Sequence, residues 1–373
     1  PQAQYGADVI MRANYALEHG TEALSMCVRK AVNEMLGSLA EDAGIRREDV
    51  FQVCVVGNTC MHHLFLGISP ASLVHAPYTP AVSERLVLNA GDYGLAVQER
   101  AELIMLSDIA GYVGADTCGC LLAIRQDQQE EISLMIDIGT NGEMVLGNRE
   151  RMVTCSTAAG PAFEGAKIEC GMRGAAGAVD HVKYEDGKWN YTTVGNKPAV
   201  GLCGSGLIDL VAGLLEAGML DENGVLRSGQ EKQGVFILVP PERGGNERGV
   251  YLTQKDLGEV QLAKAAIAAG IQMLMERLGI TEDDICSVYI AGAFGNYMDP
   301  VSAGKIGLLP ATLVKKVKPV GNAAGEGAKI ALVNEKEMLE MDELVRKIEF
   351  VELAASADFQ DHFIDELGFE TGE

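Results

Sequence analysis

This 373-residue chain lacks long apolar runs, since no stretch of 18 or more apolar residues occurs. A transmembrane helix needs about 20 such residues, so no membrane span is predicted. Basic residues are also scarce: 30 Lys and Arg stand against 53 Asp and Glu, which gives a net charge of −23. Nonspecific nucleic-acid binding and polybasic attachment to a membrane both need a positive surface, so we expect neither nucleic acid nor membrane as a partner.

Two common nucleotide-binding fingerprints are missing as well. The chain has no Gly-x-x-x-x-Gly-Lys-Ser/Thr P-loop and no Gly-x-Gly-x-x-Gly between a predicted strand and helix. Its nine cysteines are an odd number and lack the C-x₄-C-x₂-C spacing of a plant-type [2Fe–2S] site. Most lie in apolar surroundings, as Cys54 does, which is typical of reduced thiols and favours a cytoplasmic location.

Glycine, by contrast, is abundant. The 44 glycines make up about 12% of the chain, against a usual ~7%. They stand singly at the ends of predicted strands, where the backbone turns tightly or approaches a ligand. With 47% hydrophobic and 22% charged residues, the composition is that of a folded globular protein. We expect methionines such as Met26 and Met35 to fill its core or a seam.

The order of predicted elements repeats along the chain. Segments 50–125 and 286–332 both read as strand, glycine turn, helix, strand, glycine turn and small-residue helix. A β-hairpin over 132–148 precedes the second segment, and none precedes the first. We therefore predict an α/β fold of two similar lobes around a cleft, the first without its opening hairpin. The predicted domains are 1–130 (first lobe), 131–322 (second lobe, with a β insertion near 179–200) and 323–373 (a helix returning to the first lobe, plus a tail).

The clearest motif is the run Ile136–Glu143, in which a buried strand delivers Asp137 to a glycine-rich hairpin. Backbone N–H groups of such a turn can point at a phosphate, because no Cβ blocks the approach. Asp137 can hold Mg²⁺, since that ion takes one or two carboxylates plus phosphate oxygens. An ordinary hairpin with a well-placed aspartate is the alternative interpretation.

A second carboxylate, Asp116, lies at a glycine-rich helix start after 109–115. It can position water beside the same phosphate, or it can simply cap the helix, a role that aspartate favours. Two further glycine turns are Ala291–Gly295, where a nucleoside can lie against bare backbone, and Cys203–Gly206, which opens a helix and can attract an anion or serve only as a cap. The three turns together predict a nucleotide clamped between the lobes.

These motifs resemble those of the acetate and sugar kinase, heat-shock chaperone and actin ATPase superfamily. Asp137–Thr140 is similar to its second phosphate loop, 108–116 to its first connecting segment, Ala291–Gly295 to its adenosine loop and 321–328 to its second connecting segment. The resemblance implies an actin-like (ribonuclease H-like) fold and ATP with Mg²⁺ as cofactors. The candidate catalytic residues are Asp137, which would also hold the metal, and Asp116. The candidate nucleotide-binding residues are Gly139, Thr140, Asn141, Gly142, Gly204, Ser205, Gly206, Gly292, Ala293, Phe294 and Lys264.

Much of the chain resembles one branch of that superfamily, the ATP-dependent reductive activators of corrinoid proteins. The matching stretches include Val56-Gly-Asn-Thr-Cys-Met-His-His63, Ile109–Thr117, Ile136–Glu143, Cys155–Gly165, Cys203–Asp209 and Ala291–Tyr297. The resemblance implies an ATPase that helps return oxidised Co(II) corrinoid to Co(I) for methyl transfer, with a corrinoid protein as partner, and we expect a homodimer. It also suggests that Ser156 and Thr157 face the corrinoid, although a tight structural loop is the alternative there. His62 and His63 are expected to be core or surface residues rather than metal ligands.

Two features of the family are absent from this sequence. Full-length members begin with a ferredoxin-like [2Fe–2S] module, and their first phosphate loop is an Asp-x-Gly-Thr-Thr hairpin. We therefore expect an amino-terminally incomplete ATPase domain, with the electron supplied by a cluster in the missing module. Three alternatives remain open: a radical-dehydratase activator with an interfacial [4Fe–4S] cluster, a small-molecule kinase of the same fold, and a non-catalytic scaffold.

Overall fold

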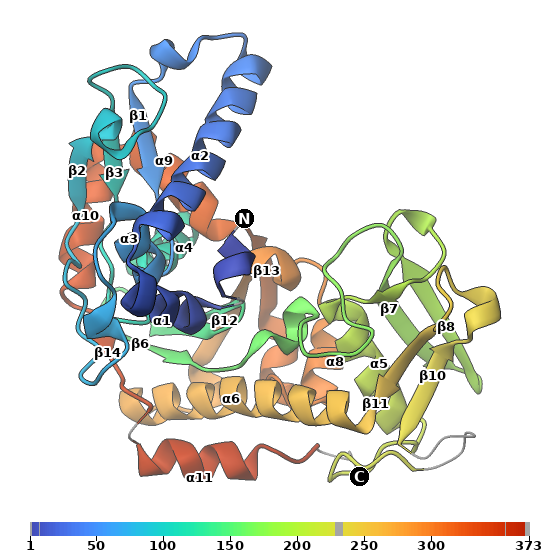
Figure 1. Cartoon of the computed structure of the whole chain (residues 1–373). Coiled ribbons are helices and arrows are strands. Elements are labelled where there is room, and N and C mark those ends of the chain that lie inside the picture. The colour runs from blue at the N-terminus through green and yellow to red at the C-terminus, as the bar shows by residue number, and fades with distance from the viewer. Residues whose placement is uncertain (1, 7, 228–233, 355, 370–373) are drawn as a thin grey trace. The chain divides into compact units, whose positions relative to one another are not determined.

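The computed structural model describes residues 2–6, 8–227, 234–354 and 356–369, and its chain divides into two compact units (Figure 1). Unit 1 comprises residues 1–129, 149–152 and 322–350. Unit 2 comprises residues 130–148, 153–321 and 351–373. Each unit therefore draws on separate stretches of the chain, and each has an α/β architecture.

Unit 1 surrounds a three-stranded sheet of order β1-β3-β2, in which β1 is parallel to β3 and β2 is antiparallel to β3. In the described residues before β1, the chain forms helices and short 3-10 turns and no β-hairpin, in agreement with the predicted lack of an opening hairpin. Its strands are β1 (Gln52–Val55), β2 (Leu86–Asn89), β3 (Glu102–Met105) and the short β14 (Glu349–Phe350). Its helices are α1 (Val9–His19), α2 (Glu22–Ala43), α3 (Thr59–Leu66), α4 (Ala115–Ile124), α9 (Ala323–Val333) and α10 (Glu335–Val345).

Helices α4 and α9 pack backbone to backbone within unit 1. A Cβ at Gly327 would lie 1.9 Å from the carbonyl oxygen of Gly119, and a Cβ at Gly119 would lie 2.6 Å from the carbonyl oxygen of Ala324. Only glycine allows an approach this close. The small-residue sequence of both helices thus explains why they come together, and the contact at Gly119 holds the middle of α4 against α9.

Unit 2 contains a mixed sheet in which β13, β12, β4, β5 and β6 lie in that order. Strand β12 runs parallel to both β13 and β4, whereas β4 and β5 form an antiparallel hairpin. The strands of this sheet are β4 (Ile132–Ile138), β5 (Gly142–Gly147), β6 (Met152–Thr157), β12 (Ile285–Ala291) and β13 (Val317–Gly321). A smaller sheet of order β8-β7-β9 and a β10–β11 ribbon complete the unit, with β7 (Ala178–Glu185), β8 (Lys188–Thr193), β9 (Gly201–Leu202), β10 (Val235–Val239) and β11 (Val250–Thr253).

Helix α6 (Gln254–Leu278) is the longest helix of unit 2, and its start follows from local chemistry. Thr253 and Asp256 form a capping box, in which each side chain bonds the backbone N–H of the other. The apolar face of α6 covers the β4–β5 hairpin, since a Cβ at Gly270 would lie 2.3 Å from Met144. The other helices of the unit are α5 (Gly204–Glu216), α7 (Gly292–Gly295), α8 (Pro300–Lys305) and α11 (Ala357–Asp365).

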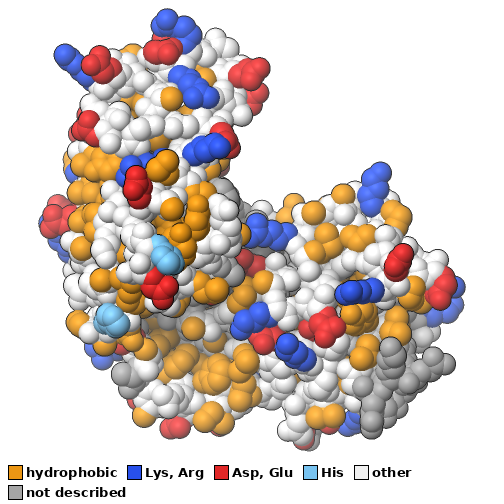
Figure 2. Space-filling view, viewed as in Figure 1, with side chains coloured by type: hydrophobic (Ala, Val, Ile, Leu, Met, Phe, Trp, Pro, Cys, Tyr) orange, Lys and Arg blue, Asp and Glu red, His pale blue; other side chains and the backbone are white. Residues whose placement is uncertain are grey.

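The face of the molecule drawn in Figure 2 carries interspersed charges. On the face shown in Figure 2, Lys and Arg side chains alternate with Asp and Glu, and the described residues of this face form no continuous basic patch. Met26 and Met35, expected to fill the core or a seam, are 62% and 56% exposed on α2, so they are not core residues. Among the described helices, none combines the length and the apolar character that a bilayer crossing requires.

Candidate nucleotide-binding site

Asp137 stands near the end of the buried strand β4. Its neighbours Ile136 and Ile138 are buried, while Asp137 itself is half-buried and pairs in register with Glu143 across the hairpin. The following turn is closed by the Gly139 N–H, which donates to the Asn141 carbonyl at 3.0 Å. The predicted strand–turn–strand is therefore present, and the Asp137 carboxylate lies just before the turn.

The end of strand β12 lies directly beside this carboxylate. Ala291 is the register partner of Asp137, so the two parallel strands deliver their following turns to the same edge of the sheet. Gly292, the next residue, has φ = +87°, and a Cβ there would lie 2.8 Å from Asp137 Oδ1. The structure thus brings the predicted phosphate hairpin and the predicted adenosine turn together. The side chains of Ala293 and Phe294, also predicted to bind the nucleotide from this turn, lie outside the described residues.

The chemistry of this edge fits a magnesium ion. Asp137 supplies a hard oxygen donor, and glycine at 292 leaves beside it the space that any side chain would fill. In the described part of the chain, no group of three or more His, Cys, Asp or Glu side chains is arranged to hold a metal. Such a site suits an ion that takes one protein carboxylate and finds its other ligands on water and phosphate.

Glu164 is a functional candidate that sequence reasoning missed. It ends the 3-10 turn Pro161–Glu164, and its Oε1 accepts a hydrogen bond of 2.9 Å from the Thr140 hydroxyl. A Cβ at Gly139 would lie 3.6 Å from the same oxygen. A second carboxylate therefore faces the glycine hairpin. The one signal in the sequence was its place in the matching run 155–165, but no spacing rule linked that run to the hairpin.

Strand β6 supports the hairpin from the other side. Thr157 is 2% exposed, and its hydroxyl donates to the Gly142 carbonyl at 3.4 Å. Ser156 is half-buried, and its hydroxyl donates to Glu143 Oε1 at 3.3 Å. The two neighbouring hydroxyls thus have different surroundings: Thr157 stabilises the turn, whereas Ser156 lies beside the carboxylate of Glu143.

The remaining residues of unit 2 that were predicted to bind the nucleotide are deeply buried. Gly204, Ser205 and Gly206 form the buried first turn of α5, where the Ser205 hydroxyl lies 3.4 Å from the sulfur of Cys203. Lys264 is 1% exposed, so its side chain is buried rather than solvated. Its ammonium group donates to the Gly368 carbonyl and lies 3.8 Å from Glu366.

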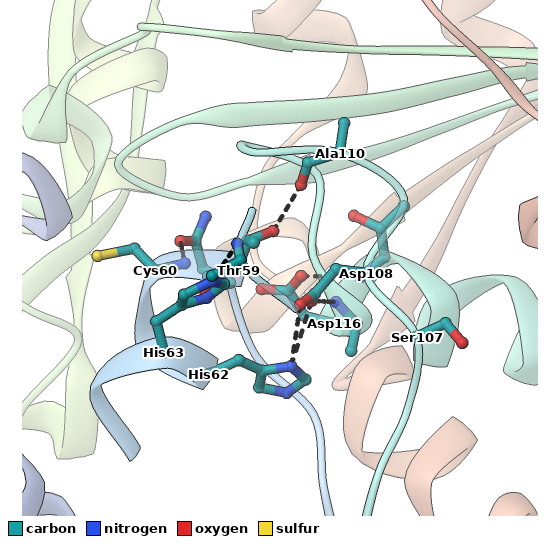
Figure 3. Close-up of polar contacts among 12 residues, drawn as sticks. Thr59, Cys60, His62, His63, Ser107, Asp108, Ala110 and Asp116 are labelled. Carbon is teal, nitrogen blue, oxygen red and sulfur yellow. Dashed lines mark hydrogen bonds and ion pairs between the residues drawn. The ribbon is translucent and has the colours of Figure 1, made fainter. Parts of the chain in front are cut away.

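In unit 1, Asp116 lies in the first turn of α4, within a cluster of polar residues (Figure 3). The N-cap residue, Gly114, offers no capping side chain; instead Asp108 Oδ1 accepts the Ala115 N–H at 2.9 Å. Asp116 accepts the N–H of Thr117 at 2.9 Å. Burial raises the pKa of the Asp116 carboxyl from 3.8 to about 6, while backbone hydrogen bonding and His62 oppose the rise. A carboxylate with a pKa near neutrality can serve as a general base.

These observations define a class of protein. The α/β fold, with a carboxylate-bearing glycine hairpin at the sheet edge, is that of the actin-like ASKHA proteins. The chain belongs to the RACo family: residues 131–373 match the family model described as the C-terminal domain of RACo, the ASKHA domain, and residues 1–129 match the RACo middle region. The predicted superfamily and branch are thereby confirmed.

Named relatives agree with this family. The chain is 35% identical over 381 residues to the corrinoid activation enzyme RamQ of Eubacterium limosum, covering 97% of this chain and 64% of RamQ. It is 27% identical to the [Co(II) methylated amine-specific corrinoid protein] reductase of Methanosarcina barkeri, covering 98% of this chain and 71% of the relative. A solved structure, described as a reductive activator for corrinoid,iron-sulfur protein, superimposes with a TM-score of 0.90 at 38% identity and covers 99% of this chain and 60% of that one.

Proposed function

We propose that this chain is the ATP-driven part of a reductive activator that returns Co(II) corrinoid proteins to Co(I). The observation that carries the proposal is the meeting of Asp137, the glycine hairpin and Gly292 at one sheet edge in a chain of the RACo family. Two relatives have names that state corrinoid activation or Co(II) corrinoid protein reduction. Because the chain spans 64% of RamQ and 60% of the matched solved chain, the whole reaction is assigned to it only as a proposal.

The residues of unit 2 have separate roles in this proposal. Within the Gly139–Gly142 turn, the Gly139 N–H closes the turn, and the N–H groups of the residues that follow are the ones offered to phosphate. Gly292 lets the nucleoside approach bare backbone. Asp137 would hold Mg²⁺, which, when bound, neutralises charge on the triphosphate. Glu164 accepts a hydrogen bond from the Thr140 hydroxyl, so the lone pairs of that hydroxyl remain able to accept a hydrogen bond from a ligand or a water.

Asp116 is proposed as the residue that orients the attacking water. Its raised pKa places its ionisation close to neutral pH, where a base is most effective. The proposal keeps the remaining predicted nucleotide-binding residues, which are 204–206 at the start of α5, Lys264, and residues 293 and 294 of the turn. Ser156, which is half-buried, stays its proposed corrinoid-facing residue, whereas Thr157, the other residue of that prediction, is 2% exposed and bonds the Gly142 carbonyl.

The proposed energy coupling follows from differential binding. Reduction of Co(II) corrinoid is uphill for biological donors, and each 59 mV of one-electron deficit corresponds to about 1.4 kcal/mol. A nucleotide can supply this only by binding two states of the protein with different affinity. We place the [2Fe–2S] electron donor in a module outside residues 1–373, propose a homodimer with a corrinoid protein as partner, and expect no role for nucleic acid or membrane. Nine free cysteines suit the reducing cytoplasm.

The experiment that tests this function measures Co(I) formation by visible absorbance in a corrinoid protein supplied with a low-potential reductant, this chain and Mg-ATP. The account predicts that reduction depends on the chain and on ATP, and that Asp137→Asn abolishes the ATP dependence. Reduction that proceeds equally without ATP would contradict the proposal, as would phosphorylation of a small acceptor without any corrinoid protein.

A further inference from the structure

A buried histidine, His62, contacts Asp108, which in turn caps the helix that bears the candidate base Asp116. His62 has no role in the function proposed so far. It is on α3, is 5% exposed, and its Nδ1 lies 3.2 and 3.3 Å from the two carboxylate oxygens of Asp108 (Figure 3). A carboxylate can only accept, so Nδ1 carries the proton and donates it. Asp108, itself 4% exposed, thus receives one donor from α3 and one from the start of α4.

The other ring nitrogen of His62 is buried and finds no hydrogen-bond partner among the described atoms. A buried polar atom without a partner costs about 1–3 kcal/mol, so packing alone does not favour histidine at this position. Its neighbour His63 contrasts with it: His63 Nε2 accepts the Ala81 N–H at 2.9 Å, and Nδ1 donates to the Thr59 carbonyl at 2.8 Å. Both nitrogens of His63 therefore hold local backbone, whereas the hydrogen bond of His62 goes to Asp108.

The loop that bears Asp108 is held against α3 by further contacts. The Thr59 hydroxyl donates to the Ala110 carbonyl at 2.7 Å. At Gly114, a Cβ would lie 2.5 Å from the carbonyl oxygen of Gly57, so the two backbones touch. With Gly114 unable to cap α4, the orientation of the first turn, and with it that of Asp116, depends on Asp108.

We propose that His62 is a positioning residue for Asp116, acting through Asp108. This inference rests on the proposed ATPase role of Asp116. His62 aligns the Asp108 carboxylate, Asp108 caps α4 at Ala115, and the capped turn holds Asp116 toward the attacking water. In its charged form His62 also lowers the pKa of Asp116, which Asp108 raises. Further ionisable groups near this turn are Cys118 on α4 and Asp342 on α10, which is paired with Arg85 at 2.7 Å.

The test compares three variants of the full chain with the wild type. His62→Leu removes the donor, His62→Asn keeps an N–H at the position of Nδ1, and His63→Leu is the matched control, a buried histidine on the same helix without a contact to Asp108. Amide hydrogen exchange without ligand reports on residues 115–117. We expect His62→Leu to speed exchange there about tenfold, His62→Asn to restore protection, and His63→Leu to leave these amides unchanged.

The same variants are then assayed for ATP hydrolysis across pH. His62→Leu should lower kcat roughly ten- to hundredfold, as expected for a misplaced catalytic group, with KM for ATP nearly unchanged. His62→Asn should recover most of kcat but move the acidic limb of the profile to higher pH, because His62, which lowers the pKa of Asp116, is gone. Unchanged exchange in His62→Leu, or an equal effect of His63→Leu, would overturn the positioning role. A wild type without ATP turnover, but with the expected exchange pattern, would support the positioning role and contradict the proposed function.

Discussion

The glycine contact between α4 and α9 makes a sharp prediction about the stability of unit 1. Gly327→Ala would place a Cβ 1.9 Å from the Gly119 carbonyl oxygen, where ordinary contact begins at 3.4 Å. The helices would have to separate by the difference, about 1.5 Å, because backbone atoms cannot rotate away as a side chain does. Overpacking of this kind costs about 3 kcal/mol, at the upper end of its usual range. Alanine has a higher helix propensity than glycine, which offsets about 1 kcal/mol of this cost, so the free energy of unfolding should fall by about 2 kcal/mol.

Thermal unfolding followed by circular dichroism measures this loss. For a unit of this size, each kcal/mol lost from the free energy of unfolding lowers Tm by about 2–4 °C, so Gly327→Ala should lower Tm by about 4–8 °C. Gly258→Ala on α6 is the matched control, since a Cβ there has no neighbour within 4 Å. It should raise stability by up to about 1 kcal/mol. If Gly327→Ala proved as stable as Gly258→Ala, the close crossing of α4 and α9 would be refuted.

Three further predictions concern single side chains. Asp116→Asn should abolish ATP turnover and stabilise the protein at pH 7.5 by up to about 3 kcal/mol, because the pKa of Asp116 in the folded state is near 6 rather than 3.8 and its ionisation therefore destabilises the fold as pH rises through this window. The gain should vanish below about pH 4, where the carboxyl is protonated in both states, and an equal gain in unfolding free energy at pH 3.5 and 7.5 would contradict the prediction. Glu164→Gln should retain Mg-ATP binding but lower kcat about tenfold, because its amide can bond the Thr140 hydroxyl without the negative charge; an unchanged kcat in steady-state assays would exclude a role for the charge. Lys264→Met should speed amide exchange over residues 366–369, whose carbonyl and carboxylate groups it binds, and wild-type protection there would show that the lysine does not hold this segment.

Local chemistry explains which parts of the fold could be predicted. The hairpin after Asp137 was predictable because an alternating buried strand and a glycine turn are signals within a few residues. The start of α6 was predictable for the same reason, since the capping box lies in four consecutive residues. The confirmed family resemblance rests on motifs of this short-range kind.

The parts that sequence reasoning missed depend on contacts between distant residues. Glu164 meets Thr140 only because the 3-10 turn folds back on the hairpin, 24 residues away. His62 meets Asp108 across 46 residues, and no periodicity indicates that pairing. Met26 and Met35 were assigned to the core or a seam from their apolar character, but that character alone does not say which face of α2 is buried.

The most direct test of the central claim is isothermal titration of this chain with Mg-ATP. The account predicts saturable binding that requires Mg²⁺ and is lost in Asp137→Asn, but is retained in Asp186→Asn, a control at an exposed turn with φ = +52° that asparagine also tolerates. Absence of binding to the wild type, or equal binding by Asp137→Asn, would contradict the claim that this hairpin holds the nucleotide.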